Sequence, residues 1–326
     1  MLITPKRKSK ISKFLRKTKL SYLPYRLGIE PGNICNLKCP LCPTGSGDLS
    51  MKKGFMELTL FKKIVDEIKG SISSLNFYSW GEPLLNPDFI SMIEYVKKVN
   101  SSIYVTTSTN LNINNRDLLV SLVRSGIDKI IVSCDGITAE SYLKYRVGGD
   151  FNLVMNNLKF IHDIEKRYNK SIVLWNFMVF KHNEKEVEKA IQLAKSLEVN
   201  LDIGKMRVSL KDDIMKTHSE NIEKYKEWIP DSPEYSGYDK EKNIPKKIIK
   251  TCIKPWQEIS INWDGKVFPC CGVYGDFFSL GNVKDSSIRE VWNNELYRIA
   301  RHEILNKKVK VKTICGICKS TGFMSM

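Results

Sequence analysis

Between Tyr25 and Ser209, short runs of β-branched and aromatic residues alternate with segments of helical periodicity, and this alternation constrains the fold most strongly. Strands that alternate with helices pair in parallel through right-handed crossovers. The sequence therefore predicts an α/β fold, with either an open doubly wound sheet or a partial barrel. The strand candidates are residues 26–30, 72–78, 102–107, 129–134, 171–179 and 200–205, and the helix candidates are residues 59–69, 87–99, 116–124, 151–168 and 183–197.

The positive charge of the chain is concentrated at its two ends. The net charge is +16 over 326 residues, and residues 1–26 contribute nine Lys and Arg side chains and no acid. Residues 301–319 carry most of the remaining excess, so the body is close to neutral and nucleic acid is not expected as a partner. Ile11, Phe14 and Leu15 are spaced for a short basic amphipathic helix that makes weak peripheral contact with an anionic partner. The alternative is a solvated terminus.

The nine cysteines indicate thiolate chemistry in a reducing compartment. No apolar run is long enough to span a membrane, and the N-terminus lacks the apolar core of a secretory signal. We therefore expect a cytoplasmic location.

Three cysteines lie close together in the loop that follows the first predicted strand. Cys35, Cys39 and Cys42 stand in the sequence PGNICNLKCPLCPTGSG, where proline and glycine disfavour both helix and strand. Thiolates select iron–sulfur clusters or zinc. Three ligands from one loop leave one metal position open, and an open position is where added molecules react. Buried cysteines or a structural zinc site are the alternatives.

This Cys-x3-Cys-x2-Cys loop resembles that of the radical S-adenosylmethionine (SAM) superfamily. The resemblance implies a partial (β/α)6 TIM-like barrel and a [4Fe–4S] cluster whose open iron binds SAM. One electron then cleaves SAM to methionine and a 5′-deoxyadenosyl radical, which abstracts a hydrogen atom from the substrate. In this family, polar groups at successive strand ends bind SAM. The matching residues here are Gly81, Glu82, Asn110, Ser133, Asp135 and Arg146.

The sequence departs from the family pattern at three positions next to these residues or in the cysteine loop. Trp80 replaces the first glycine of the Gly-Gly-Glu-Pro turn, and Leu111 stands where the family has glycine after Asn110. Leu41 replaces the aromatic residue that usually precedes the last loop cysteine and packs near the adenine. Cys134, next to Ser133, is expected to be buried in the barrel.

The C-terminal part resembles the SPASM-type extension of the same superfamily. Cys252, Cys270, Cys315 and Cys318 are enough to hold one auxiliary [4Fe–4S] cluster, although a four-cysteine zinc site fits the spacing as well. Residues 259–270 predict a hairpin that turns at Asp264-Gly265, and residues 286–299 predict one helix. We expect a basic arm at 1–24, the barrel at 25–225, a linker at 226–250 and a SPASM-like domain with an auxiliary cluster at 251–326.

These features together predict a radical SAM oxidoreductase that dehydrogenates a small polar or anionic metabolite with the help of the auxiliary cluster. A maturase that modifies a peptide or protein is the first alternative, and a non-catalytic iron–sulfur electron carrier is the second. An electron donor such as flavodoxin or ferredoxin is an expected partner. The catalytic base is not identifiable, and Asp202 and Glu258 are guesses for a side chain near the site.

Overall fold

The computed structural model describes residues 4–47, 52–208, 218–246, 251–272, 275–306 and 311–321. Its main sheet has eight strands in the order β10-β9-β1-β2-β3-β4-β5-β6. The strands from β1 to β6 are all parallel, as the alternation with helices requires. Their bounds are Arg26–Ile29 (β1), Ser74–Phe77 (β2), Tyr104–Thr109 (β3), Lys129–Ser133 (β4), Val173–Val179 (β5) and Asn200–Lys205 (β6).

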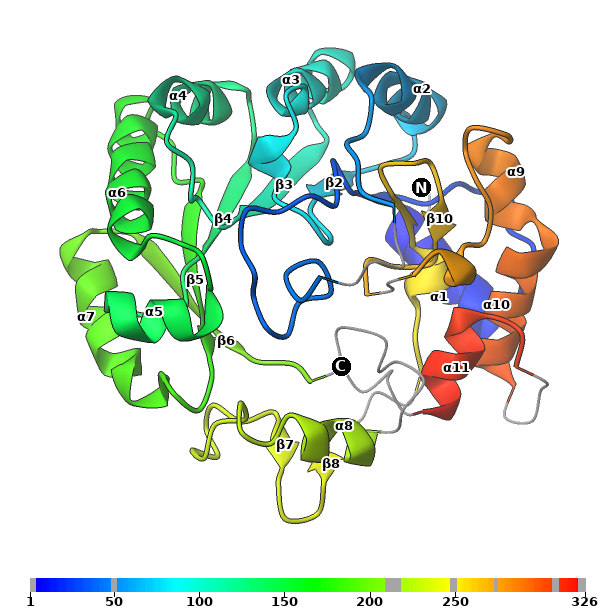
Figure 1. Ribbon diagram of the computed structural model, residues 1–326. Coiled ribbons are helices and arrows are strands. Elements are labelled where there is room, and N and C mark those ends of the chain that lie inside the picture. The colour runs from blue at the N-terminus through cyan, green and yellow to red at the C-terminus, as the bar shows by residue number, and fades with distance from the viewer. Residues whose placement is uncertain are drawn as a thin grey trace.

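The sheet curves strongly, and helices cover its outer face (Figure 1). In the described part of the chain, no pairing joins β6 to β10, so the arrangement is the partial barrel. The fold expected from the sequence is thereby confirmed. The covering helices are α2 (Leu58–Ile68), α3 (Phe89–Val99), α4 (Arg116–Arg124), α6 (Phe151–Arg167) and α7 (Val187–Ser196), with α5 (Ala139–Tyr145) in the loop after β4.

Each covering helix packs an apolar stripe against the sheet. In α2 the buried residues Leu60, Ile64 and Ile68 recur at helical spacing. Two of the covering helices begin at residues whose side chains accept a backbone N–H, Asn115 before α4 and Asp150 before α6. These local signals explain why the predicted boundaries lie within a few residues of those observed. Short 3-10 helices are η1 (Pro83–Leu85), η2 (Glu184–Glu186), η4 (Lys254–Trp256) and η5 (Asp276–Phe278).

The C-terminal region adds two strands to the same sheet. Strand β9 (Glu258–Ile261) pairs in parallel with β1, and β10 (Val267–Phe268) returns antiparallel beside β9. The turn between them contains Gly265 at φ +87°, as expected for the Asp-Gly sequence. The C-terminal region therefore completes the edge of the barrel sheet. The helices that follow are α9 (Ile288–Asn293), α10 (Glu295–Leu305) and α11 (Ile314–Ser320).

The prediction of one helix over residues 286–299 is wrong. Asn294 separates α9 from α10 in an extended conformation. Its side chain accepts the N–H of Tyr297 and donates to the carbonyl of Leu280, 2.7 Å away. An asparagine that gains both bonds by leaving the helix stabilises the break.

The region expected to be a linker contains ordered structure in its described part. Helix α8 (His218–Lys224) precedes it, and strands β7 (Tyr238–Asp239) and β8 (Ile244–Pro245) form a small hairpin. Tyr238 is buried and accepts the N–H of Val208 at its hydroxyl. Residues 247–250 lie outside the described residues.

The basic arm forms a helix, α1 (Pro5–Phe14), and the apolar residues whose spacing predicted it lie on its solvent-facing side. Ser9 and Ser12 are buried, whereas Ile11, Phe14 and Leu15 are exposed. The interpretation as a solvated terminus is wrong for the described part of this arm, because α1 packs on η4. None of the helices in the described ranges has the length and apolar character needed to traverse a lipid bilayer.

Candidate active site

The loop that carries Cys35, Cys39 and Cys42 connects β1 to α2 and lies over the middle of the curved sheet (Figure 1). Backbone hydrogen bonds fix it to two other loops, from Lys38 to the carbonyl of Val147 (2.8 Å) and from Glu82 to the carbonyl of Ile34 (2.9 Å). The chain folds tightly on itself inside the loop. A Cβ at Gly45 would lie 2.4 Å from the backbone nitrogen of Cys39, so only glycine fits there.

Two of these thiols are in contact with polar side chains, one from the end of β3 and one from the end of α5. The amide of Asn110 lies 3.7 Å from Sγ of Cys35, and a guanidinium nitrogen of Arg146 lies 3.9 Å from Sγ of Cys39. Burial raises the pKa of Cys35 to about 12. Burial also raises the pKa of Cys39, although Arg146 acts in the opposite direction. Metal ions must displace these protons, because thiolates are the ligands.

Glu82 is fully buried and joins the ends of β2 and β3. Its carboxylate accepts the hydroxyl of Thr109 (2.6 Å) and the backbone N–H groups of Asn110 (2.7 Å) and Leu84 (3.2 Å). Burial raises the pKa of Glu82, and these hydrogen bonds oppose the rise. Three donors from the chain already hold this side chain, so its position in the site is fixed before any ligand arrives.

The two turns next to Glu82 keep their backbone shape although Trp80 and Leu111 depart from the family pattern. A Cβ at Gly81 would come within 2.0 Å of the carbonyl oxygen of Gly32. Leu111 has φ +56°, the left-handed conformation that favours glycine, and its side chain is fully buried. The leucine thus keeps the glycine-like turn after Asn110 and adds an apolar anchor.

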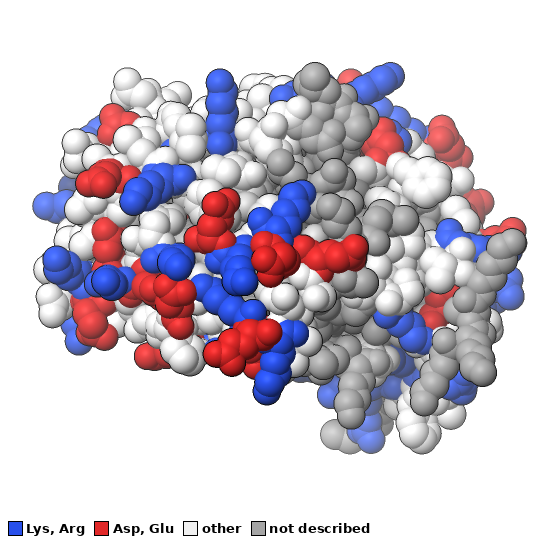
Figure 2. All heavy atoms as spheres, turned by 60° about the horizontal axis from the view of Figure 1, so that its bottom comes forward, with Lys and Arg blue, Asp and Glu red and all other residues white. Residues whose placement is uncertain are grey.

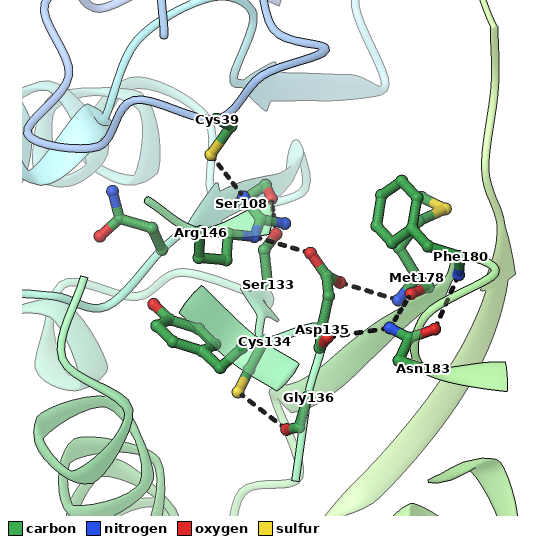
Figure 3. A network of polar contacts seen from close by, with 12 residues as sticks. Cys39, Ser108, Ser133, Cys134, Asp135, Gly136, Arg146, Met178, Phe180 and Asn183 are labelled. Atoms are coloured by element: carbon green, nitrogen blue, oxygen red, sulfur yellow. Dashed lines mark hydrogen bonds and ion pairs between the residues drawn. The ribbon is translucent and has the colours of Figure 1, made fainter. Parts of the chain in front are cut away.

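Asp135, which is fully buried just after β4, forms an ion pair with the partly buried Arg146 at the end of α5 (Figure 3). Nε of Arg146 lies 2.7 Å from the Asp135 carboxylate, whose other oxygen accepts the N–H of Met178 at 2.8 Å. Burial alone would lower the pKa of Arg146, but Asp135 and Cys39 raise it above its ordinary value. Arg146 therefore remains a cation between Asp135 and the cysteine loop. Ser133 pairs with Ser108 through their hydroxyls, 3.2 Å apart.

A second apolar cluster encloses the cysteine loop, and the sequence analysis did not detect it. Tyr145 packs against Phe180 with ring centroids 4.2 Å apart, and Trp228 contacts both rings. The members of this cluster come from segments that are distant in sequence, among them α5, α8 and β7, so no periodicity marks them. The cluster consists of Leu37, Cys39, Leu41, Tyr145, Phe180, Met206, Val208, Ile222, Tyr225, Ile229 and Tyr238.

The other cysteine group lies in the C-terminal region. Cys252 precedes η4, Cys270 follows β10, and Cys315 and Cys318 are one turn apart on α11. The four thiols are close enough that Cys270, Cys252 and Cys318 all raise the pKa of Cys315, after burial as the main cause. Burial raises the pKa of Cys318 to about 12.

Lys254 was missed by the sequence analysis, although a cation two residues after Cys252 was a usable signal. Cys270 is the largest cause of a raised pKa of Lys254, so the amine stays charged beside the thiols. The Lys254 amine also lies 3.6 Å from the Glu258 carboxylate. Asp202 is on β6, where it accepts a hydrogen bond from Asn176 at 3.1 Å.

Helix α11 is attached to α10 by two buried contacts. The carboxylate of Glu303 accepts the N–H of Lys312 (2.5 Å) and the hydroxyl of Thr313 at the start of α11. The amine of Lys319 donates to the carbonyls of Glu303 and Ile304 at the end of α10. These contacts fix the position of Cys315 and Cys318 relative to η4 and β10.

Both thiol sets fit iron–sulfur clusters in their chemistry. Among the described residues, no three Cys, His, Asp or Glu side chains converge in the manner of ligands to a single metal ion. A [4Fe–4S] cube takes its thiolates at separate irons, so its ligands need not meet at one point. Cys35, Cys39 and Cys42 would hold such a cube, and Asn110 and Arg146 lie beside two of these three thiols. Cys134 is fully buried, as expected, and Cys271 stands beside Cys270 without belonging to the predicted set.

Comparisons with known proteins match the two parts of the chain that carry the two cysteine groups. A family model described as the radical SAM superfamily matches residues 29–194, and one described as an iron–sulfur cluster-binding domain, SPASM, matches residues 252–319. The AdoMet-dependent heme synthase of Methanosarcina barkeri is 24% identical over 87% of this chain and 85% of its own. The subtilosin biosynthesis protein AlbA of Bacillus subtilis is 24% identical over 93% and 69%, respectively.

A solved structure of anSMEcpe with bound AdoMet has the same fold. Its TM-score is 0.61 at 19% identity, and the match covers 87% of this chain and 81% of that one.

Proposed function

Because this chain belongs to the radical SAM superfamily and carries a SPASM iron–sulfur domain, we propose that it oxidises a small polar or anionic metabolite by removing two hydrogen atoms. Its cofactors are SAM and [4Fe–4S] clusters. When bound, they supply one-electron chemistry: SAM is cleaved to a radical that takes a hydrogen atom, and the auxiliary cluster accepts an electron.

The side chains that we assign to these cofactors come from the two sites described above. Cys35, Cys39 and Cys42 hold the first cluster, and the C-terminal set of four cysteines holds the second. Glu82 and Asn110 fix the turn at the ends of β2 and β3, where the amino group of SAM would bind. Arg146, which remains charged beside Asp135, would attract the carboxylate of SAM.

The observation that carries the substrate proposal is a cavity of about 110 Å³ inside the curved sheet, whose wall contains charged and polar side chains among apolar ones. It suits a small polar group, because its volume is that of a few water molecules. Cys271 is part of its wall, so the cavity adjoins the auxiliary cysteines. Its wall is formed by Arg26, Leu27, Gly28, Asn76, Tyr78, Lys254, Glu258, Ile259, Ser260 and Cys271.

The charges around this cavity favour an anionic or hydroxyl-bearing group. Lys254 and Arg26 supply cations, and burial raises the pKa of Tyr78 to about 12, so its hydroxyl remains a donor at neutral pH. Glu258 lies in the same wall, whereas Asp202 does not, so we favour Glu258 as the acceptor of the substrate proton.

A peptide substrate is the second candidate, and one comparison favours it. The similarity to AlbA, whose name assigns it to bacteriocin biosynthesis, covers 93% of this chain. A side chain of a peptide could enter the same cavity as a metabolite could. An experiment must therefore distinguish between the two kinds of substrate.

The proposed function is tested by mass spectrometry of reaction mixtures. The anaerobically reconstituted enzyme, dithionite and SAM are incubated with sugar phosphates, other acidic metabolites or peptides. We expect 5′-deoxyadenosine and a metabolite that has lost two hydrogen atoms. A peptide that has lost two hydrogen atoms, with no change in any metabolite, would contradict the preference for a small molecule.

Two cysteine variants separate the roles of the two sites. Cys39→Ala should reduce formation of 5′-deoxyadenosine to background, because one ligand of the first cluster is lost. Cys318→Ala should retain cleavage of SAM but stop oxidation of the substrate. Cys134→Ala, outside both sets, is the control. Normal turnover by Cys318→Ala would show that the auxiliary site is not needed.

A further inference from the structure

Helix α1 presents its apolar side chains to solvent. Ser9 faces the protein, where its hydroxyl accepts the side-chain amide of Gln257 at 3.1 Å. Phe14 is 85% exposed, Leu15 54% and Ile11 39%. A phenylalanine this exposed at the end of an ordered helix is a feature of surfaces that bind a partner.

Basic side chains surround these apolar residues. Residues 1–26 contain no acid, so the positive potential of this surface is not neutralised from within the arm. Around α8 and β7–β8, by contrast, Lys and Arg alternate with Asp and Glu (Figure 2), and Lys181 and Lys240 both pair with Asp231. The exposed cations on and next to α1 are Lys6, Arg7, Lys8, Lys10, Arg16, Lys17 and Lys19.

This basic surface lies directly beside the auxiliary cysteines. A groove runs between α1 and the C-terminal region, and its wall includes Thr251 and Ile253, the two neighbours of Cys252. Lys13 in the same wall is close enough to Cys252 for the two groups to affect each other's pKa, although burial is the larger cause for both. Among the described residues that form the groove, none is acidic. They are Lys10, Lys13, Phe14, Arg16, Thr251, Ile253, Ile304 and Leu305.

The groove is held rigidly in place. Arg16 donates to the carbonyl of Leu305 (3.1 Å) and to the side chain of Asn306 (2.5 Å), which joins the end of α1 to the end of α10. A rigid apolar centre with a basic rim is the complement of an acidic protein surface with an apolar centre.

We propose that α1 and the groove beside Cys252 are the docking surface for an acidic electron-transfer protein that removes electrons from the auxiliary site. This inference rests on the proposed function, which leaves one electron at that site in each turnover. The auxiliary cluster would return from its one-electron-reduced to its oxidised state. An oxidised flavodoxin would take that electron and one proton from water to form its flavin semiquinone.

The test is binding of oxidised flavodoxin to the reconstituted enzyme, measured by titration calorimetry at several salt concentrations. The variants are Lys6→Glu/Lys10→Glu, which reverses exposed charges, and Phe14→Ala, which removes the apolar centre. We expect each to weaken binding by about tenfold or more and the charge reversal to flatten the salt dependence. Lys159→Glu/Lys189→Glu, with the same charge change on the outer faces of α6 and α7, should bind like the wild type.

Equal binding by the α1 variants and the wild type would overturn the proposal. Binding to vesicles that contain about 30% phosphatidylglycerol, dependent on Phe14 and without flavodoxin binding, would overturn it in favour of a lipid surface. Cleavage of SAM with dithionite should be unchanged in every variant, because a chemical reductant needs no docking surface. Failure of the wild type to cleave SAM would contradict the proposed function while leaving the binding result intact.

Discussion

At the scale of single residues, burial decides whether the carboxyl group of Glu30 is charged. Glu30 follows β1 and is almost fully buried, with one carboxylate oxygen accepting the N–H of Trp263 at 3.3 Å. The backbone of Trp80 also acts on this carboxylate and, like that of Trp263, opposes the effect of burial on its pKa. Burial raises the pKa of Glu30 to about 8, so the side chain is largely protonated at neutral pH.

A protonated Glu30 makes stability depend on pH. The unfolded chain releases this proton near pH 4.5 but the folded chain keeps it until about pH 8, so stability falls as pH rises between these values. The loss is about 1.4 kcal/mol per pH unit. We expect Glu30→Gln to remove this decline in urea unfolding curves, and Glu57→Gln, at an exposed site, to keep it. A decline of the same size in Glu30→Gln would contradict the assignment.

At the scale of elements, close contacts between helices decide where the auxiliary cysteines lie. A Cβ at Gly316, in the middle of α11, would lie 2.7 Å from the Glu303 carboxylate. That carboxylate also holds the start of α11 through Thr313. Glycine therefore allows the helix that carries Cys315 and Cys318 to pack against α10.

Gly316→Ala tests this packing. Alanine favours a helix by about 1 kcal/mol, but the clash with a carboxylate that is held in place should cost about 1–3 kcal/mol, so we expect net destabilisation. The iron content after reconstitution should fall, because α11 moves away from Cys252 and Cys270. Gly70→Ala is the matched control, since a Cβ there has no atom within 4 Å. Full iron loading and unchanged stability in Gly316→Ala would contradict this account.

At the scale of the whole molecule, the N-terminal arm packs against the C-terminal region and is bonded to it through Arg301. The guanidinium of Arg301 is buried and donates to the carbonyls of Thr18, Pro255 and Trp292, each at 2.8 Å. It also lies over the rings of Trp292 and Tyr297. Burial lowers the pKa of Arg301 to about 10, so the group remains charged at neutral pH.

Replacement of Arg301 should loosen the arm. Arg301→Leu leaves three buried carbonyls without their donors, and we expect a loss of about 4 kcal/mol in the free energy of unfolding. Trypsin should then cleave the arm faster at Lys17 and Lys19. Arg301→Lys should lose less, because it keeps the charge and part of the hydrogen bonding. Arg298→Leu, exposed on the same helix, is the control, and equal cleavage rates in the Arg301 and Arg298 variants would refute the link.

The sequence by itself determined the order of the barrel elements. The strands and covering helices lie where periodicity placed them, because each buries one apolar face against its neighbours whatever lies farther away. The spacing of the two cysteine groups also follows from the sequence, since short loops and one helical turn keep each group together. The roles of Glu82, Asn110, Ser133, Asp135 and Arg146 toward SAM stay predictions.

The tertiary structure decided what depends on contacts between distant segments. Only the fold brings β9 beside β1, surrounds the cysteine loop with Tyr145 and Phe180, and turns the apolar residues of α1 outward. The helical stripe at Ile11, Phe14 and Leu15 predicted a helix but not its orientation. Orientation is set by the hydrogen bonds that Ser9 and the backbone of Lys17 make with Gln257 and Trp256, more than two hundred residues away.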